Sequence, residues 1–536
     1  MQRILRGRSR PPLTPTLSHV GERGFFLSLL SAVLYILSFP NWNLSALAWV
    51  ALVPLSLVVL KCPPRQAFFR AWLSGTAAYA GLLYWIVVTF QAAHLSPLFG
   101  LACLLLLAAY LGLYWGVWAW FLAKIPPNPP FVKGGRGGFM LFAVAGAAAW
   151  VALEYLRTYL FTGFPWTLLA DSQIHYLPII QIASVTGAYG VSFLVVLVNV
   201  ALAVIARSEA TWQSRTSTGL RSPRSRWSLA MTAFVPALVA ATCYLFGLTR
   251  LHRAPTAAPA RPLAVALLQG NIDQYRKWDR RYVEDIENRY AALVEQTSPS
   301  HPDMILWPET SVPGYLLQDP PLRKWLDEVV RKSGTWHIVG APVLHGKEAM
   351  NSAFVLDPQA YLGAEYGKQH LVPFGEFVPW SGILNRWIQV LNDLGGFFPG
   401  DQSPVVKANG ARVGVNICYE AIFPAIIRRS VLQGAQVIAN LTNDGWYMKT
   451  SAPYQHFAPN VLRAVENHRW VIRADNTGIS AIIDPFGRVR EASPIFQPAV
   501  ITGPVEPLSD LTFYTRCGDW FAWLCCGFSI LAIILA

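Results

Sequence analysis

The stretch Ala411–Pro424, with the sequence ARVGVNICYEAIFP, decides the fold of the region around it. From Val413 to Ile417 apolar residues alternate with small or polar ones, which is typical of a short buried strand. Cys418 follows the strand, and Tyr419–Ile422 is predicted to form the first turn of a helix. A cysteine on such a turn lies near unpaired N–H groups and the positive end of a helix dipole, which favour the nucleophilic thiolate. A lone cysteine is more often an inert core residue, so the rest of the chain has to decide between the two interpretations.

Composition separates this region from the rest of the chain. The 536 residues are 53% hydrophobic and only 14% charged, which differs strongly from an average soluble protein. The apolar residues are concentrated outside the window Arg261–Leu511. Between Pro262 and Leu511 there are 22 Lys and Arg against 25 Asp and Glu, although the whole chain carries a net charge of +13. The basic excess therefore belongs to the hydrophobic part, which argues against nucleic-acid binding and indicates membrane topology.

The hydrophobic part is predicted to be a polytopic helical membrane domain. Residues 1–24 are basic and lack apolar periodicity, so we predict a disordered tail there. About eight apolar stretches follow, seven within residues 25–250 and one within residues 518–536. Most of them approach the ~20 residues that cross a bilayer. They are Phe25–Phe39, Leu44–Leu60, Ala71–Phe90, Leu95–Ala123, Phe139–Leu160, Ile179–Ala206, Trp227–Leu248 and Trp520–Leu535.

Loop charges predict the orientation of these spans. Basic residues lie in the tail and in every second loop, whereas the intervening short loops hold almost none. The positive-inside rule places the tail and the basic loops in the cytoplasm. Seven spans then place Arg261–Leu511 on the extracytoplasmic face, and the eighth brings the C-terminus back to the cytoplasm. Two of the basic loops contain low-complexity segments, Pro126–Gly138 and Ser208–Arg226, which we interpret as tolerated insertions.

The extracytoplasmic region is predicted to be an α/β layered domain, because short apolar strands alternate with amphipathic helical patterns. Cys418 is the only cysteine in it, and an exported domain usually pairs its cysteines, so Cys418 is a candidate reactive thiol. No Cys/His spacing indicates a metal site. The predicted strands include Leu263–Gln269, Met304–Trp307, Trp336–Gly340, Val437–Leu441 and Ile479–Asp484, and the predicted helices include Tyr282–Gln296 and Leu322–Ser333.

Three motifs carry candidate catalytic residues. LWPET ends a predicted strand at Glu309, GKQHLVPFGE contains Lys368 and Glu376, and the third motif is the Cys418 turn. Singly, a glutamate or a lysine is most often a solvated surface charge. Here both Glu309 and Lys368 lie beside apolar strand ends marked by Pro and Gly, where active-site loops are commonly held.

The order of these motifs, with QGNI (Gln269–Ile272) before them and TNDGW (Thr442–Trp446) after, resembles the nitrilase, or carbon–nitrogen hydrolase, superfamily. Together with the spans, the chain from Phe25 to Leu535 is similar to the membrane-bound branch of that superfamily, the apolipoprotein N-acyltransferases. The resemblance implies an αββα sandwich on a helical membrane domain, without a cofactor.

The same resemblance implies an activity and a location. A fatty acyl chain is transferred from a phospholipid, such as phosphatidylethanolamine, to the N-terminal α-amino group of a diacylglyceryl-cysteine apolipoprotein. The reaction passes through a cysteine thioester and is the last step of bacterial lipoprotein maturation. We therefore expect a monomeric, multi-pass protein of the bacterial inner membrane with its catalytic domain on the periplasmic face.

The resemblance also implies roles for individual residues. Cys418 would be the nucleophile, Glu309 the general base, and Lys368 the cation that neutralises the oxyanion. Glu376 would orient Lys368 and moderate its pKa. The supporting residues matched to the family pattern are Tyr419, Glu420, Trp278 and Trp446.

Two other classes of protein stay open on the residues alone. A membrane-tethered amidohydrolase would use the same catalytic residues and let water resolve the acyl-enzyme. A transporter with an extracytoplasmic binding module is the second alternative. The apolar stretches contain few charges, of which Glu154 and Arg157 are the most prominent, whereas ion-coupled carriers need such groups.

Overall fold

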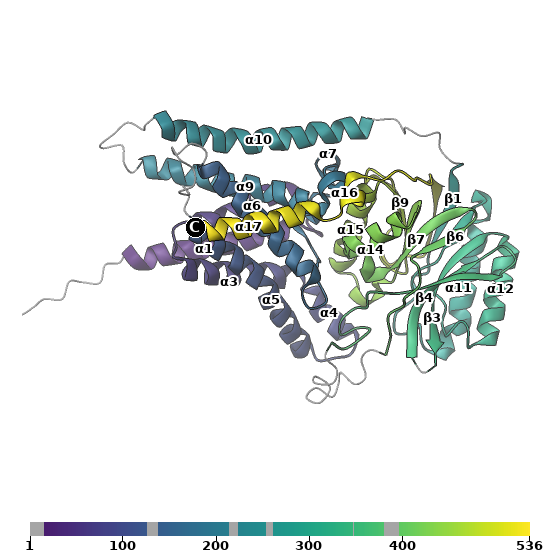
Figure 1. The fold of residues 1–536 in the computed structure, drawn as a ribbon. Coiled ribbons are helices and arrows are strands. Elements are labelled where there is room, and N and C mark those ends of the chain that lie inside the picture. Colours follow the sequence, from purple (N-terminus) through teal and green to yellow (C-terminus); the bar gives the residue numbers. More distant parts are fainter. Residues whose placement is uncertain (1–15, 126–137, 214–222, 253–260, 347, 380–395) are drawn as a thin grey trace, which may run out of the picture.

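The computed structural model describes residues 16–125, 138–213, 223–252, 261–346, 348–379 and 396–536 (Figure 1). A helical domain lies on one side and an α/β domain on the other. Helix α1 (Thr16–Leu37) begins within residues 1–24, the stretch predicted as a disordered tail, and continues into the first predicted span. Pro15 is the last proline before the apolar span, and the isolated glycines that follow weaken a helix without ending it. Residues 1–15 of the predicted tail lie outside the described residues.

In the part of the chain that the structure describes, fewer helices are long enough to cross a membrane than the eight that the sequence predicts. Among the described residues, four helices are long and apolar enough to span a bilayer: Pro97–Lys124, Phe139–Tyr159, Ala188–Arg207 and Met231–His252. A fifth candidate is a pair of helices bent by 44°, and the prediction of about eight spans is therefore not confirmed. The elements are α5 (Pro97–Lys124), α6 (Gly138–Tyr159), α9 (Ala188–Gln213), α10 (Pro223–His252) and the bent pair α3 (Pro64–Leu82) and α4 (Trp85–Ala92).

Two predicted spans are interrupted for local reasons. The stretch Leu44–Leu60 forms the 3₁₀ turn η1 (Ser45–Trp49) and the short helix α2 (Val53–Val59), because Pro54 starts a new helix and cannot continue one. The stretch from Ile179 is broken at Gly187, whose φ of +69° is a left-handed conformation. Only α9 continues beyond it; α7 (Leu177–Ile180) and α8 (Ala183–Thr186) precede it.

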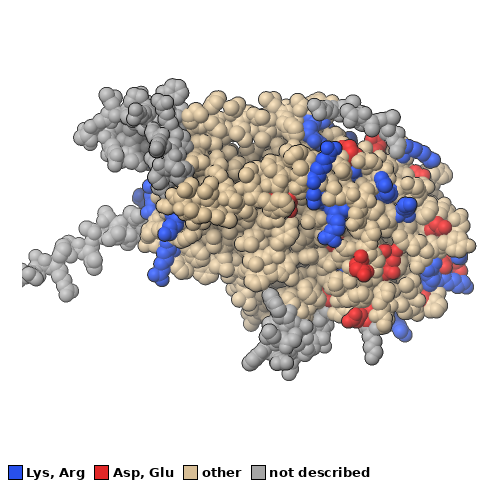
Figure 2. Space-filling view, in the orientation of Figure 1, with Lys and Arg blue, Asp and Glu red and all other residues tan. Residues whose placement is uncertain are grey.

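The helical domain has the surface expected of a membrane protein. Figure 2 shows a broad belt almost without Lys, Arg, Asp or Glu, with basic residues gathered at the end farthest from the α/β domain. Large apolar side chains such as Leu98, Leu106 and Ile534 are more than two-thirds exposed on the helices, at 77%, 73% and 73%. Exposed apolar area of this extent indicates contact with lipid.

The two prominent charges of the helical domain are both buried. Glu154 accepts hydrogen bonds from the indole N–H of Trp150 at 3.0 Å and from the backbone N–H of Leu169 at 2.9 Å. Arg157 donates to the hydroxyl of Tyr79. These contacts tie α6 to α3 and to the chain that follows α6, so both charges contribute to helix packing.

The α/β domain contains two six-stranded sheets that pack face to face. Their strand orders are β12-β1-β2-β3-β4-β5 and β11-β10-β9-β8-β7-β6. The strands are β1 (Leu263–Gln269), β2 (Met304–Leu306), β3 (Trp336–His345), β4 (Glu348–Leu356), β5 (Leu362–Gly367), β6 (Val405–Ala408), β7 (Ala411–Ile417), β8 (Val437–Thr442), β9 (Trp470–Asp475), β10 (Ala481–Ile483), β11 (Val489–Ala492) and β12 (Ala499–Val505).

Helices cover the outer face of each sheet, which gives the predicted αββα sandwich. One buried cluster between the sheets joins Leu267 and Leu306 of the first sheet to Ile417 and Leu441 of the second. The first sheet is covered by α11 (Val283–Gln296) and α12 (Pro320–Ser333), and the second by α14 (Pro424–Leu432) and α15 (Ala452–Asn467). Strands β1 to β3 are parallel to one another, as are β7 to β9, so several strands of each sheet end at one edge.

The chain enters and leaves the α/β domain at the same place. β1 pairs antiparallel with β12, with Leu263 opposite Val505. After β12 the chain forms α16 (Phe513–Cys517) and α17 (Trp520–Ile534), which runs back along the helical domain (Figure 1). The α/β domain is thus an insertion between α10 and α17.

Candidate active site

Cys418 lies directly after β7 in a strained backbone conformation. Its φ is +52°, a left-handed value that is uncommon for residues other than glycine. The residues after it form the 3₁₀ turn η6 (Cys418–Ile422), and the α-helix α14 begins only at Pro424. The predicted strand is correct, whereas the predicted helical turn is a 3₁₀ turn that precedes the helix.

The predicted preference of Cys418 for the thiolate form is wrong in this structure. Burial raises the pKa of the thiol well above its ordinary value, and the Glu309 carboxylate raises it further. The Lys368 ammonium acts in the opposite direction without reversing the result. The side chain is 6% exposed, so desolvation outweighs a short 3₁₀ turn. A neutral thiol needs a base to become a nucleophile.

Lys368 joins the two predicted acids. It follows β5, is 1% exposed, and its Nζ lies 3.2 Å from Glu309 Oε1 and 2.9 Å from Glu376 Oε1. Burial alone would lower the pKa of Lys368, but Glu309 and Glu376 outweigh burial and raise it well above its ordinary value. Lys368 is therefore an ammonium group held between two carboxylates.

Asn351 is a member of this cluster that sequence reasoning missed. It lies on β4, and its Nδ2 donates to Glu309 Oε1 at 2.7 Å and to Glu376 Oε1 at 3.1 Å. Its Oδ1 has no hydrogen-bond partner among the described residues. The available signal was a polar residue within the apolar strand EAMNSAFVL, where a buried amide needs a partner.

Glu420 is buried and links the lysine loop to the nucleophile strand. Its carboxylate accepts from the backbone N–H groups of Gln369 at 2.7 Å, His370 at 3.0 Å and Ile417 at 2.6 Å. It also accepts from the Tyr366 hydroxyl at 2.9 Å. These bonds connect the loop that carries Lys368 to the turn that carries Cys418.

Tyr419 connects the nucleophile turn to the helical domain. Its ring is buried and its hydroxyl donates to the backbone carbonyl of Gly163 at 3.2 Å. Phe423, with its ring 5.2 Å from that of Tyr419, belongs to the same apolar cluster as the helices. The catalytic turn is therefore packed directly against the membrane domain.

The two predicted tryptophans lie in different segments: Trp278 between β1 and α11, and Trp446 in the 3₁₀ turn η7 (Asp444–Tyr447). Trp278 is 48% exposed and Trp446 is 45% exposed. The residues adjacent to them are fixed: Lys277 bonds the backbone of Glu309, and Tyr447 packs on Trp85 of α4 at 4.9 Å between ring centroids. Both indoles are thus presented to solvent by anchored loops.

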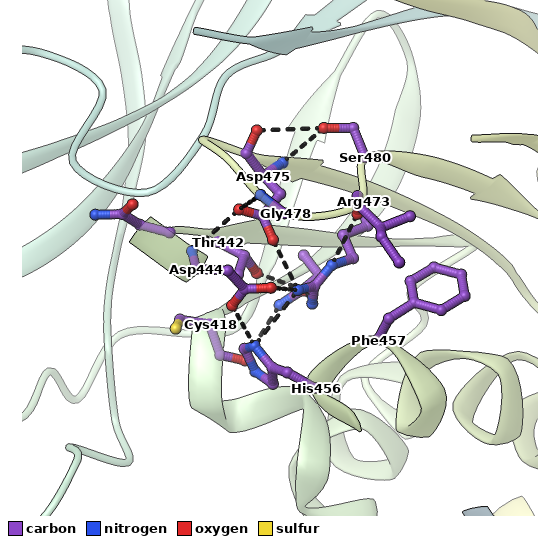
Figure 3. Close-up of polar contacts among 12 residues, drawn as sticks. Cys418, Thr442, Asp444, His456, Phe457, Arg473, Asp475, Gly478 and Ser480 are labelled. Carbon is purple, nitrogen blue, oxygen red and sulfur yellow. Dashed lines mark hydrogen bonds and ion pairs between the residues drawn. The ribbon is translucent and has the colours of Figure 1, made fainter. Parts of the chain in front are cut away.

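A second buried polar network supports the nucleophile turn and was also missed (Figure 3). Arg473 Nη2 lies 2.8 Å from Asp444 Oδ2 and 2.9 Å from Asp475 Oδ2, and His456 Nδ1 lies 2.7 Å from Asp444 Oδ1. Burial lowers the pKa of His456 to about 3, so the ring is neutral. Figure 3 shows the ring next to the backbone of Cys418.

The helical domain also reaches this second network. Trp166 stacks on His456 with 5.4 Å between ring centroids, and its indole N–H donates to Gln455 Oε1 at 2.9 Å. Trp85 donates to the same oxygen at 3.1 Å. Among the described residues no group of three or more His, Cys, Asp and Glu could hold a metal ion.

A four-layer sandwich with a cysteine, a lysine and two glutamates at one edge defines a nitrilase-type carbon–nitrogen hydrolase domain. Residues 264–507 match the carbon-nitrogen hydrolase family, and residues 31–201 match the apolipoprotein N-acyltransferase N-terminal domain.

Full-length relatives agree with both matches. Apolipoprotein N-acyltransferase of Geobacter metallireducens is 37% identical over 97% of this chain and 97% of its own. The protein of that name from Azotobacter vinelandii is 32% identical over 96% of this chain and 94% of its own. This chain therefore belongs to the apolipoprotein N-acyltransferase family. A crystal structure of an amidase from Nesterenkonia sp. is similar over 49% of this chain and 96% of its own, with 20% identity and a TM-score of 0.36.

Proposed function

We propose that this protein transfers a fatty acyl chain from a membrane phospholipid to the N-terminal α-amino group of diacylglyceryl-cysteine apolipoproteins. One observation carries the proposal: a nucleophile turn with the Glu309–Lys368–Cys418 arrangement packs directly on a lipid-exposed helical domain through Tyr419 and Gly163. An acyl donor dissolved in the bilayer and a protein acceptor anchored in the bilayer both require this geometry.

The first half-reaction acylates the enzyme. Glu309 takes the proton of the Cys418 thiol, and the thiolate attacks the ester carbonyl of the phospholipid. Lys368, together with a backbone N–H that follows the nucleophile, neutralises the tetrahedral oxyanion. One such donor is worth roughly 3 kcal/mol of barrier. The intermediate collapses to a thioester, and Glu309 returns the proton to the departing lysophospholipid alcohol.

The second half-reaction transfers the acyl chain to the acceptor. The free α-amine of the apolipoprotein attacks the thioester carbonyl and a C–N bond forms, while Glu309 accepts the proton that the amine loses. The C–S bond then breaks, and Glu309 passes this proton to the departing thiolate, which regenerates the Cys418 thiol. An amide is more stable than a thioester, so the step needs no nucleotide. Glu376 and Asn351 hold Glu309 and Lys368 in place during both steps, and Trp278 and Trp446 contact the substrates.

The same arrangement supports a location. We propose that the protein is a monomer of the bacterial inner membrane, with the described helices within residues 25–250 and 518–536 in the bilayer and residues 261–511 on the periplasmic face. The basic residues at the end of the helices away from the α/β domain support this orientation (Figure 2). A phospholipid such as phosphatidylethanolamine is the proposed donor.

The test is acyl transfer by the whole chain in phospholipid vesicles. A phospholipid labelled in its acyl chain is supplied with a diacylated lipopeptide that has a free α-amine, and the expected product is labelled lipopeptide plus lysophospholipid. Release of labelled fatty acid irrespective of acceptor would instead identify an amidohydrolase-like enzyme, and no release at all would favour a binding or transport role. Cys418→Ala must abolish the reaction, while the same change at Cys103, a half-buried cysteine on α5, serves as the matched control.

A further inference from the structure

Lys277 is a buried lysine to which neither the motifs nor the proposed mechanism assigns a role. It lies in the loop between β1 and α11 and is 1% exposed. Its Nζ donates to the backbone carbonyl of Glu309 at 3.1 Å and to Thr310 Oγ1 at 2.7 Å. Lysine is almost never fully buried unless it is paired, and both of these acceptors are uncharged. Burying this ammonium group therefore has a desolvation cost, and the fold tolerates this cost next to the proposed general base, Glu309.

The contact fixes an unusual stretch of backbone. Thr310 has a φ of +44°, which is a left-handed conformation and rare for a β-branched residue. On its other side the same stretch is fixed to β3, where the backbone N–H of Ser311 donates to the carbonyl of Gly340 at 2.8 Å. A Cβ at Gly340 would lie 2.1 Å from the carbonyl oxygen of Pro308, so β3 approaches as closely as the chain allows. The direction of the Glu309 side chain depends on this two-sided clamp.

The ionisable groups that act on Lys277 include two of the proposed reaction, Glu309 and Cys418. Burial lowers the pKa of Lys277 to about 7, against the opposing effects of Glu309, Asp475 and Cys418. Its charge therefore responds to changes at the base and at the thiol. The next residue, Trp278, is the half-exposed indole of the same loop, so the loop that presents Trp278 is fastened to the base through Lys277.

We propose that Lys277 is a positioning residue for the general base: it holds the Glu309–Thr310 backbone in its left-handed conformation and anchors the Trp278 loop to it. The inference rests on the role proposed above for Glu309. Lys277 itself forms no bond to the reacting atoms, and it acts by fixing where the Glu309 carboxylate lies relative to Cys418 and Lys368.

The test is Lys277→Met in the full-length protein, read by alkylation of Cys418 with iodoacetamide across the neutral and alkaline pH range. We expect alkylation at neutral pH to slow by about tenfold or more, since small displacements of a reacting group have effects of that size. The pH of half-maximal alkylation should rise, because the Glu309 carboxylate is displaced and the nearby Lys277 ammonium is lost. In the acyl-transfer assay kcat should fall while KM for phospholipid changes little. A purely structural lysine would move the melting temperature and leave the alkylation pH profile in place.

Two further variants keep the test decisive. Thr310→Val removes the hydroxyl that accepts from Lys277 and should slow alkylation a fewfold, and the double variant should be no slower than Lys277→Met because both changes break the same contact. If Lys277→Met does not fold, the alkylation rate and pH profile of Thr310→Val test the positioning role instead. Lys332→Met, at an exposed lysine paired with Glu295 at 3.4 Å, is the matched control and should leave rate and profile unchanged.

Wild-type rate and pH profile in Lys277→Met or in Thr310→Val would overturn the inference. The alkylation assay requires neither phospholipid nor lipopeptide. If the protein failed to transfer acyl chains but Lys277→Met still slowed alkylation, the proposed function would fall and the positioning role would stand.

Discussion

Replacing Lys368 separates its contribution to catalysis from its contribution to stability as the cation between two buried carboxylates. Lys368→Arg keeps the positive charge between Glu309 and Glu376, but a planar guanidinium needs more room than an ammonium that is 1% exposed and within 3.2 Å of both acids. The guanidinium N–H groups pair with the carboxylates, so no donor is directed at the oxyanion. Loss of one such donor lowers kcat by about 10²–10³-fold, or roughly 3–4 kcal/mol.

Lys368→Met is the companion variant. It leaves two buried carboxylates without their cation, and breaking a buried ion pair in this way costs about 3–5 kcal/mol of stability. We therefore expect the arginine variant to unfold close to the wild-type temperature and the methionine variant to unfold well below it, while both are almost inactive. Single-turnover acylation of Cys418 and thermal unfolding in detergent measure the two effects separately. Near-normal acylation in Lys368→Arg would show that the lysine is only a structural ion-pair member and would refute the oxyanion role.

Four further predictions follow from the same geometry. With phospholipid present and acceptor absent, mass spectrometry should find one acyl chain on the Cys418 peptide, removable by neutral hydroxylamine; Cys418→Ser should abolish the adduct, and label on another residue would contradict the mechanism. Glu420→Gln should slow acylation by about tenfold or more, because it weakens charged bonds that position both reacting loops; an unchanged rate would exclude a positioning role. The stability of Lys277→Met relative to wild type should be highest below about pH 7 and should fall as pH rises from about 7 to 10.5, because the folded-state pKa lies below the ordinary 10.5 and the penalty for burying the wild-type ammonium disappears over that interval; a pH-independent difference in chemical denaturation would argue against the lowered pKa. A reporter active only outside the cytoplasm should work when fused near Pro262 and fail near Gly219, and the opposite pattern would reverse the orientation.

The parts of the site that follow from local sequence could be predicted. Alternation in β7 indicated a buried strand that ends at Cys418, and the carboxylates and the lysine were found because they stand at strand ends in recognisable motifs. Such patterns depend on neighbours within a few residues of each other, which a single sequence displays directly.

The parts that depend on distant neighbours were not predictable. Asn351 reaches Glu309 from another strand, and the network of Asp444, His456 and Arg473 assembles from separate elements. The prediction of a thiolate at Cys418 was wrong for the same reason: burial depends on the whole fold, and its effect on the pKa outweighed that of the local turn. Hydropathy alone also does not show where an apolar stretch is interrupted, as Pro54 interrupts the stretch Leu44–Leu60, and the predicted number of spans is not confirmed.

Hydrogen bonds join the helical domain to the α/β domain: Tyr419 donates to Gly163, and Trp85 and Trp166 donate to Gln455. These bonds matter for the choice of fragments to express. A truncated fragment made of the α/β region alone would expose Phe423 and leave a formerly buried amide without its indole donors. We expect such a fragment to precipitate when it is expressed by itself. We therefore expect activity to require the helical domain and the α/β domain together, purified in detergent or reconstituted in vesicles.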